Sequence, residues 1–195
     1  MEPAQVLDLL RRSDALLEGH FELSSGLHSD RYFQCALALC DPRHAEQLAR
    51  GLAAKLRGLS IDVVVGPALG AVVMAHEVAR ALGVRGLFTE RKDGPMALRR
   101  GFRVRPGERA LVVEDVVTTG GSAKEVVAVL RQLGAEPVAV GCIVNRSGGN
   151  PFQDLGLPLF SLAEVTARTW RPEEAPAEFR GSTPVKPGSR VGPKS

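Results

Sequence analysis

The chain has 195 residues, with 25 Lys and Arg against 22 Asp and Glu, and a formal net charge of +3. Hydrophobic residues make up 44% and aromatic residues only 5%. This composition predicts a globular protein with one sizeable core and excludes an aromatic platform for single-stranded nucleic acid. The only local cluster of positive charge is too small for a nucleic-acid-binding stripe and instead suits a phosphate-rich small ligand. It consists of Arg99, Arg100, Arg103 and Arg105.

Cysteine usage and the N-terminus indicate the compartment. Cys35, Cys40 and Cys142 are odd in number and lack the spacing of a zinc site, so free thiols are expected. No basic start followed by an apolar run marks a signal peptide, and no apolar stretch approaches the roughly 20 residues that span a bilayer. We therefore expect a cytoplasmic protein with neither a membrane nor a nucleic-acid partner.

The first third of the chain changes pattern twice. Apolar spacing predicts a short helix in about the first ten residues. Between His20 and Leu39 the apolar residues, Leu37 and Leu39 among them, alternate loosely around a Ser-Gly turn, which predicts two strands. Pro42 then opens a helix that ends at Gly58.

Strands alternate with helices from position 61 onward. The predicted strands cover 61–65, 86–89, 111–113 and 137–144, and the predicted helices cover 72–82 and 122–133. Short, wholly apolar strands in this alternation are typical of a parallel sheet with helices on both faces. Ligands of such sheets bind beyond the carboxyl ends of the strands, so the loops after Val65, Thr89, Val113 and Val144 are candidate sites.

Two stretches fall outside this alternation. Residues 90–105 are Arg-rich with a turn signal at Asp93-Gly94-Pro95, which predicts a mobile loop or hairpin. Residues 171–195 are rich in Pro, Gly and charge and predict an extended strap or a partly disordered tail. The chain is thus expected to divide into an N-terminal segment (1–41), a core (42–170) and a tail (171–195).

The loop after Val113 carries the strongest chemical signal. It reads Glu114, Asp115, Val116, Val117, Thr118, Thr119, Gly120, Gly121 and Ser122. The glycines let an anion approach the backbone, and the amides of the following helix start, with the hydroxyls, form a site for a phosphate dianion. Glu114 and Asp115 would repel phosphate and suit ribose hydroxyls or a hydrated metal. An ordinary helix N-cap explains Ser122 alone, and the P-loop and dinucleotide signatures are absent.

This segment closely resembles the ribose-phosphate signature of type I phosphoribosyltransferases. The resemblance implies an α/β fold: a parallel sheet flanked by helices, a small N-terminal hood and a mobile loop. It implies that every residue from Glu114 to Ser122 binds 5-phosphoribosyl-1-diphosphate (PRPP), the acids at the ribose hydroxyls and the remaining residues at the 5′-phosphate. Arg91 and Lys92 match the basic start of the mobile loop, and they join Asp115 as candidate catalytic residues.

The diphosphate end of the site departs from the family pattern. Ala68, Leu69 and Gly70 match the loop whose amides approach the leaving diphosphate. Some family members carry lysines at about Ser24 and Gly70, and this chain has neither. Either Arg99 or Arg100 could supply the missing charge, and the sequence does not assign which.

The base is indicated by two further segments. Residues 19–33 resemble the hood of orotate phosphoribosyltransferases, in which an aromatic pair, here Tyr32 and Phe33, lies against orotate. Arg146 matches an Arg that pairs with the orotate carboxylate, and Thr118 is placed beside the base. Taken alone, Tyr32 and Phe33 could be core aromatics and Arg146 a surface residue.

The resemblance implies transfer of the phosphoribosyl group from PRPP to orotate in UMP biosynthesis, giving orotidine 5′-phosphate and diphosphate. It further implies Mg²⁺ held mainly through substrate and water rather than by protein ligands, and a homodimer with shared active sites. No dedicated catalytic base is needed, because the orotate ring nitrogen is readily deprotonated. Two alternatives stay open: a purine-base phosphoribosyltransferase, and a non-catalytic regulator that keeps the fold.

Overall fold

The structure is a computed structural model that describes residues 1–23, 25–91 and 94–187. Its centre is a six-stranded sheet in the order β5-β4-β3-β6-β7-β8. The strands are β3 (Val63–Pro67), β4 (Arg85–Glu90), β5 (Ala97–Leu98), β6 (Arg109–Val117), β7 (Glu136–Asn145) and β8 (Leu159–Glu164). All run parallel except β5, which pairs antiparallel with β4. The predicted parallel α/β class is confirmed, and the antiparallel pairing of β4 with β5 agrees with the hairpin alternative for the 90–105 segment.

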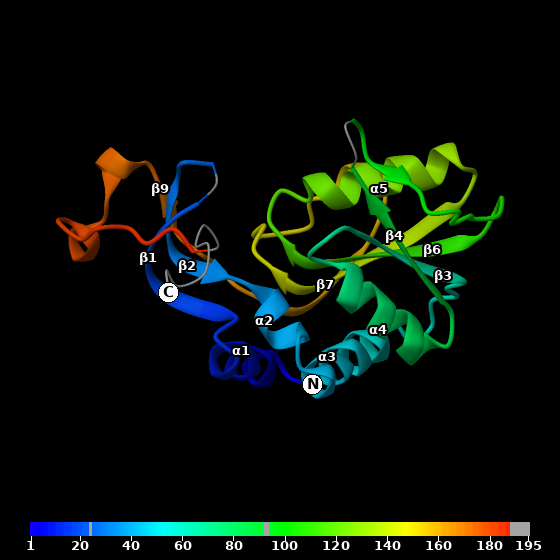
Figure 1. The fold of residues 1–195 in the computed structure, drawn as a ribbon, viewed down its shortest axis with the longest axis horizontal. Helices are drawn as coiled ribbons and strands as arrows, with labels where there is room; N and C mark the ends of the chain where they lie inside the picture. Colours follow the sequence, from blue (N-terminus) through cyan, green and yellow to red (C-terminus); the bar gives the residue numbers. More distant parts are fainter. Residues whose placement is uncertain (24, 92–93, 188–195) are drawn as a thin grey trace, which may run out of the picture.

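Helices cover both faces of this sheet (Figure 1). Helices α3 (Pro42–Lys55) and α4 (Val72–Leu82) lie on one face, and α5 (Gly121–Gln132) lies on the other. Alternate residues of one strand serve the two layers: Val64 packs with α3 and α4, whereas Val63 and Val65 pack with α5. Because both faces are buried, the strands read as continuous apolar runs.

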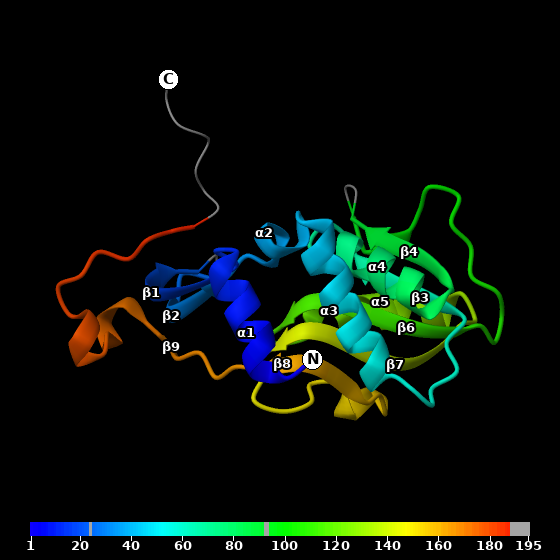
Figure 2. The same ribbon diagram turned by 90° about the horizontal axis from the view of Figure 1, so that it is seen from below.

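A second, three-stranded sheet forms the hood. Its order is β1-β2-β9, from β1 (Leu16–Glu22), β2 (His28–Phe33) and β9 (Thr169–Trp170). Helix α1 (Pro3–Arg12) lies between the hood and the central sheet (Figure 2), and its buried Val6, Leu9 and Leu10 belong to the α3–α4 side of the core.

Two local predictions are wrong, and two strands were missed. Leu37 and Leu39 belong to helix α2 (Cys35–Leu39) rather than a strand, because the pairing of β2 with β1 ends at Phe33 and Leu16. The strand predicted to end at Val113 continues to Val117, paired throughout with β7, so Glu114 and Asp115 lie within it. Strands β8 and β9 were not predicted.

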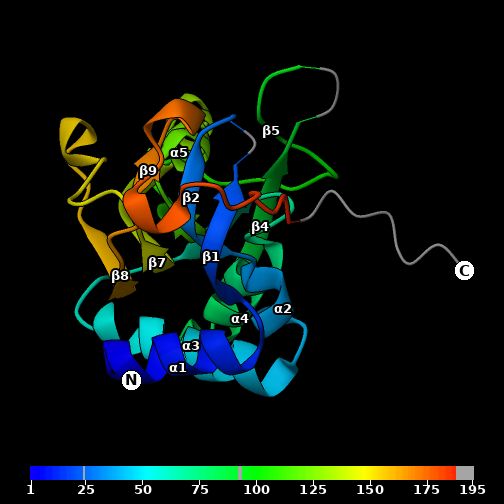
Figure 3. The ribbon, with the colours of Figure 1, turned by 90° about the vertical axis from the view of Figure 1, so that its left-hand side faces the viewer.

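The tail runs back over the hood (Figure 3). The Phe179 ring stacks on Trp170 with centroids 5.2 Å apart, and the Ser182 hydroxyl lies 2.7 Å from Nδ1 of His20. Val185 then forms a parallel bridge to Phe21. The described part of the tail, residues 171–187, is therefore an extended strap.

Over residues 1–23, 25–91 and 94–187, no helix is both long and apolar enough to cross a membrane.

Candidate active site

The strand order creates a crevice at one edge of the central sheet. The chain leaves β3 for its neighbour β4 on one side, whereas it leaves β6 for β7 on the other side. The loops after β3 and β6 therefore diverge, and ligands of open parallel sheets bind at such a point. The candidate diphosphate loop follows β3, and the candidate phosphate loop follows β6.

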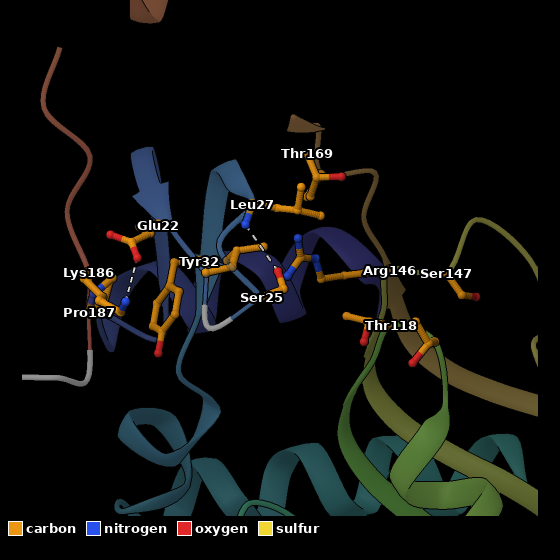
Figure 4. Close-up of a pocket in the computed structure, with 13 residues that line it drawn as sticks. Glu22, Ser25, Leu27, Tyr32, Thr118, Arg146, Ser147, Thr169, Lys186 and Pro187 are labelled. Atoms are coloured by element: carbon orange, nitrogen blue, oxygen red, sulfur yellow. Dashed lines mark hydrogen bonds and ion pairs between the residues drawn. The ribbon is translucent and has the colours of Figure 1, made fainter. Parts of the chain in front are cut away.

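Two adjoining cavities open at this edge. The larger, of about 810 Å³, lies between the hood and the carboxyl ends of β6 and β7 (Figure 4). The smaller, of about 300 Å³, is lined by the loop from Thr118 to Ser122 with Arg91 and Glu114. Thr118 and Thr119 line both cavities, so a ligand in one can contact a ligand in the other.

The start of α5 is built to leave its amides open. The residue before the helix is Gly120 in the left-handed conformation, with φ 74°, and no described side chain caps the helix. Gly120 is buried, and a Cβ there would lie 2.8 Å from the Phe152 ring. Only glycine fits, because both the positive φ and the close approach exclude a side chain. The N-cap alternative for Ser122 is wrong, and the first amides of α5 remain available to an anion.

The two acids of β6 meet the diphosphate loop. Desolvation, with the neighbouring Asp115 charge, raises the pKa of Glu114, and desolvation raises the pKa of Asp115. The Val116 amide donates a hydrogen bond of 2.8 Å to Asp115 Oδ1. A Cβ on Gly70 would lie 3.1 Å from Asp115 Oδ2, so the loop after β3 contacts this carboxylate. Adjacent buried carboxylates favour a ligand that supplies hydroxyl donors or a cation.

The remaining members of the diphosphate loop lie beside this contact. The Ala68 amide donates a hydrogen bond of 2.7 Å to the Thr89 carbonyl, which fixes the loop to β4. The side chain of Leu69 is 87% exposed, so it packs on nothing within the described part of this chain.

Arg146 follows β7 and enters the larger cavity. Its backbone amide bonds to the Val117 carbonyl at 2.7 Å, and its guanidinium carbon lies 5.3 Å from the Phe33 ring centroid. Nη2 is 3.5 Å from Ser29 Oγ, whereas the buried Nε has no hydrogen-bond partner among the described residues. Desolvation lowers the pKa of this guanidinium. A partly buried cation with an unsatisfied donor is a receptor for an anion.

Of the two aromatic residues expected at the base, Tyr32 lines the larger cavity and Phe33 does not. Tyr32 lines the larger cavity, and its hydroxyl donates to Gln34 Oε1 at 3.1 Å. Phe33 lies beneath the Arg146 guanidinium instead, where the ring face attracts the cation and holds it in place.

Of the basic residues considered in the 90–105 segment, only Arg91 lines one of the two cavities among the described residues. Arg91 lines the smaller cavity and forms an ion pair with Glu125 of α5. Lys92 lies outside the described residues. Arg99 and Arg100 both pair with Glu90, at 3.8 and 3.0 Å, and neither lines either cavity.

Sequence reasoning missed Glu22, Lys186 and Glu125, which also line the cavities. Glu125 could have been predicted from the sequence, because it lies on α5 within one turn of Ser122. Glu22 and Lys186 meet only through the return of the tail, which no local pattern shows. Within residues 1–23, 25–91 and 94–187, no group of three or more His, Cys, Asp or Glu side chains could hold a metal.

A parallel sheet with an uncapped helix start and two carboxylates at its switch point is typical of α/β proteins that bind phosphorylated ligands. Residues 38–156 match the family model of the phosphoribosyl transferase domain, so the class is the phosphoribosyltransferases. A relative from Heliobacterium modesticaldum named orotate phosphoribosyltransferase is 53% identical, over 98% of this chain and 100% of its own. Another of that name, from Caldanaerobacter subterraneus, is 50% identical over 97% and 99%. The chain belongs to the orotate phosphoribosyltransferase family.

The solved structures agree with this assignment. The orotate phosphoribosyltransferase of Mycobacterium tuberculosis in complex with PRPP superimposes with a TM-score of 0.67 at 28% identity. The match covers 83% of this chain and 95% of that one.

Proposed function

We propose that this chain transfers the phosphoribosyl group of PRPP to a ring nitrogen of orotate, giving orotidine 5′-phosphate and diphosphate. The observation that carries this proposal is Arg146, whose half-buried guanidinium faces the larger cavity with Nε unsatisfied. Its fork of donors suits a carboxylate, which orotate carries and adenine and hypoxanthine lack.

The donor is assigned to the smaller cavity and to the diphosphate loop beside it. The 5′-phosphate is assigned to the amides and hydroxyls from Thr118 to Ser122, and Val116 and Val117 lead into this loop. Glu114 and Asp115 are assigned to the ribose hydroxyls, and Asp115 reaches the diphosphate loop through its contact with Gly70. The diphosphate is assigned to Ala68, Leu69 and Gly70. Arg91, which lines the smaller cavity, and Lys92 are both assigned to the diphosphate from the sequence.

The chemistry follows from these positions. The bond from the anomeric carbon to the diphosphate oxygen breaks, the bond to the ring nitrogen forms, and positive charge develops on the sugar between the two. The carboxylate of Asp115 is assigned to stabilise that charge, and Arg91 and Lys92 are assigned to neutralise the leaving diphosphate. Thr118, at the junction of the cavities, holds base and sugar within reach of each other. No histidine is among the described residues that line either cavity. The proton of the attacking ring nitrogen is readily lost to solvent, so no dedicated base is required.

Mg²⁺ is the proposed cofactor. Glu114 and Asp115 are hard oxygen donors, but two adjacent carboxylates do not complete the six ligands that the ion takes, so substrate oxygens and water must supply the rest. Bound there, the ion would neutralise the diphosphate as it leaves.

A homodimer, a cytoplasmic location and the three-part division complete the proposal. Exposed apolar side chains on α2, the diphosphate loop and α4 (Leu37, Leu69 and Val73) suit contact with a second copy. Cys35, Cys40 and Cys142 are free thiols, as in a reducing compartment. Residues 1–41 would act as hood, 42–170 as catalytic core and 171–195 as a C-terminal tail.

One assay tests the function. The protein is mixed with Mg²⁺, PRPP and orotate, and loss of orotate absorbance is followed; parallel reactions contain adenine, hypoxanthine or xanthine. Turnover of orotate alone is expected. Turnover of a purine without orotate would favour the purine enzyme, and binding of PRPP without turnover of any base would favour a regulator. Chelation of Mg²⁺ should stop the reaction, and light scattering during gel filtration measures the dimer.

A further inference from the structure

Part of the wall of the larger cavity comes from the tail. Val185 adds to the free edge of β1: the Glu22 amide donates to the Val185 carbonyl, and the Val185 amide donates to the His20 carbonyl, each at 2.8 Å. The next two residues, Lys186 and Pro187, line the cavity. A pair of backbone hydrogen bonds therefore sets the position of Lys186.

The strap is fixed at earlier points as well. Arg168, beside β9, forms ion pairs with Glu178 of the tail at 2.7 Å and with Asp30 of β2 at 3.0 Å. Together with the Phe179–Trp170 stack, this anchors the tail before it reaches the cavity. Lys186 and Pro187 are thus held in fixed positions in the wall of the larger cavity.

Lys186 forms a polar pair with Glu22 at the cavity. Its Nζ lies 2.6 Å from Glu22 Oε1, and the two side chains are 51% and 35% exposed. An ion pair this exposed contributes little to stability, about 0–1 kcal/mol. The pair places the Lys186 ammonium, a donor, beside the Glu22 carboxylate, an acceptor, on the side of the cavity away from Arg146 (Figure 4).

Orotate carries complementary groups at opposite ends of its ring. The carboxylate is attached to a ring carbon, and the imide N–H lies directly across the ring from that carbon, between two carbonyl oxygens. We propose that Glu22 and Lys186 recognise this imide edge: the Glu22 carboxylate accepts from the imide N–H, and the Lys186 ammonium donates to a flanking carbonyl. The assignment rests on orotate being the base, as proposed above.

Anchoring both ends orients the nucleophile. The ring nitrogen that attacks the sugar is adjacent to the carboxylate-bearing carbon, so it lies on the Arg146 side of the ring. With the carboxylate on Arg146 and the imide on the Glu22–Lys186 pair, the ring can turn only about the line that joins them. Rotation about that line brings the nitrogen toward Thr118, where the two cavities meet. The ammonium also stabilises negative charge that spreads onto the carbonyl oxygens of the deprotonated ring.

The test uses the variants Lys186→Met and Glu22→Met, with Lys124→Met as the matched control. Lys124 forms a surface ion pair of 3.0 Å with Asp154 and lines neither cavity. Calorimetry gives the Kd of orotate and of PRPP separately, and thermal unfolding shows that each variant is folded. Loss of one charge-assisted hydrogen bond should weaken orotate binding about tenfold in each cavity variant, and PRPP binding by less than about twofold.

Orotate methylated on the imide nitrogen completes the experiment. The native protein should discriminate strongly against this analogue, and Glu22→Met should lose most of that discrimination. Unchanged orotate affinity in both cavity variants would overturn the inference, as would equal losses for orotate and PRPP, which would place Lys186 at the diphosphate. Failure of the native protein to bind orotate would instead refute the proposed function itself.

Discussion

Replacing Arg146 with methionine removes the guanidinium from the base cavity but keeps an unbranched stem over the Phe33 ring. The side chain is half-buried, and its Nε has no partner among the described residues. A carboxylate that bonds to two of its nitrogens gains two charge-assisted hydrogen bonds, each of about 1.5–3 kcal/mol. Since 1.4 kcal/mol is a factor of ten, the Kd of orotate should rise at least about a hundredfold.

The same change should stabilise the unliganded protein. Burial of an unsatisfied donor costs about 1–3 kcal/mol, and methionine removes that donor. We therefore expect Arg146→Met to unfold at a higher temperature than the native protein while binding orotate far more weakly. A charged side chain that lowers the stability of the unliganded protein but strengthens ligand binding is typical of a binding residue rather than a structural one.

Calorimetric titration with orotate and, separately, with PRPP measures both affinities, and thermal unfolding without ligand measures stability. Arg131→Met is the control, because Arg131 bonds to the Leu155 carbonyl at 2.9 Å, away from both cavities. Equal weakening of orotate and PRPP binding would refute the assignment of Arg146 to the carboxylate. An unfolding temperature of Arg146→Met below that of the native protein would refute the idea that the Arg146 charge destabilises the unliganded protein.

Three further predictions concern the donor side of the site. Asp115→Asn keeps the hydrogen bond from the Val116 amide but removes the charge, so turnover should fall at least about a hundredfold with the unfolding temperature maintained; a small loss of turnover would contradict its role. The raised pKa of Glu114 means that the fold favours its neutral form, so the unliganded protein should lose stability as the pH rises from about 5 to 8. Glu114→Gln should flatten that slope in denaturant titrations, and an unchanged slope would contradict the assignment. Gly120→Ala should raise the KM for PRPP and lower the unfolding temperature more than Gly148→Ala, which has a similar φ of 73° but nothing within 4 Å of the added Cβ; equal effects would show that Phe152 does not restrict the loop.

Local patterns predicted much of the fold and located the loop that we propose binds the donor. The loop after β6 could be identified from sequence because its glycines, hydroxyls and acids are contiguous, and the helix start that completes it follows at once. Helix α4 was placed at Val72–Leu82 in full, since an apolar periodicity ends there at Gly83. Residues within one strand–loop–helix unit need no distant partner to be recognised.

The missed features depend on long-range pairing. Strand β6 extends past Val113 because β7 supplies partners as far as Asn145, which overrides the polar character of Glu114 and Asp115. Strand β9 has two residues and exists only because β2 pairs with it. Glu22 and Lys186 are 164 positions apart, so their meeting follows from the path of the tail and not from either segment.

The pairing of β3 with β6 fixes the distance between the loops that follow these two strands. The two loops that we propose bind the donor leave neighbouring strands, and the hydrogen bonds between these strands fix their spacing at about 4.8 Å. Residues can be exchanged in either loop without moving its origin, whereas a slip of one residue in β3 would turn Val63, Val64 and Val65 to the wrong faces. Evolution can therefore replace the hood and the residues that select the base while the distance between the leaving group and the 5′-phosphate stays constant. One inherited scaffold can in this way serve many acceptors with a single donor.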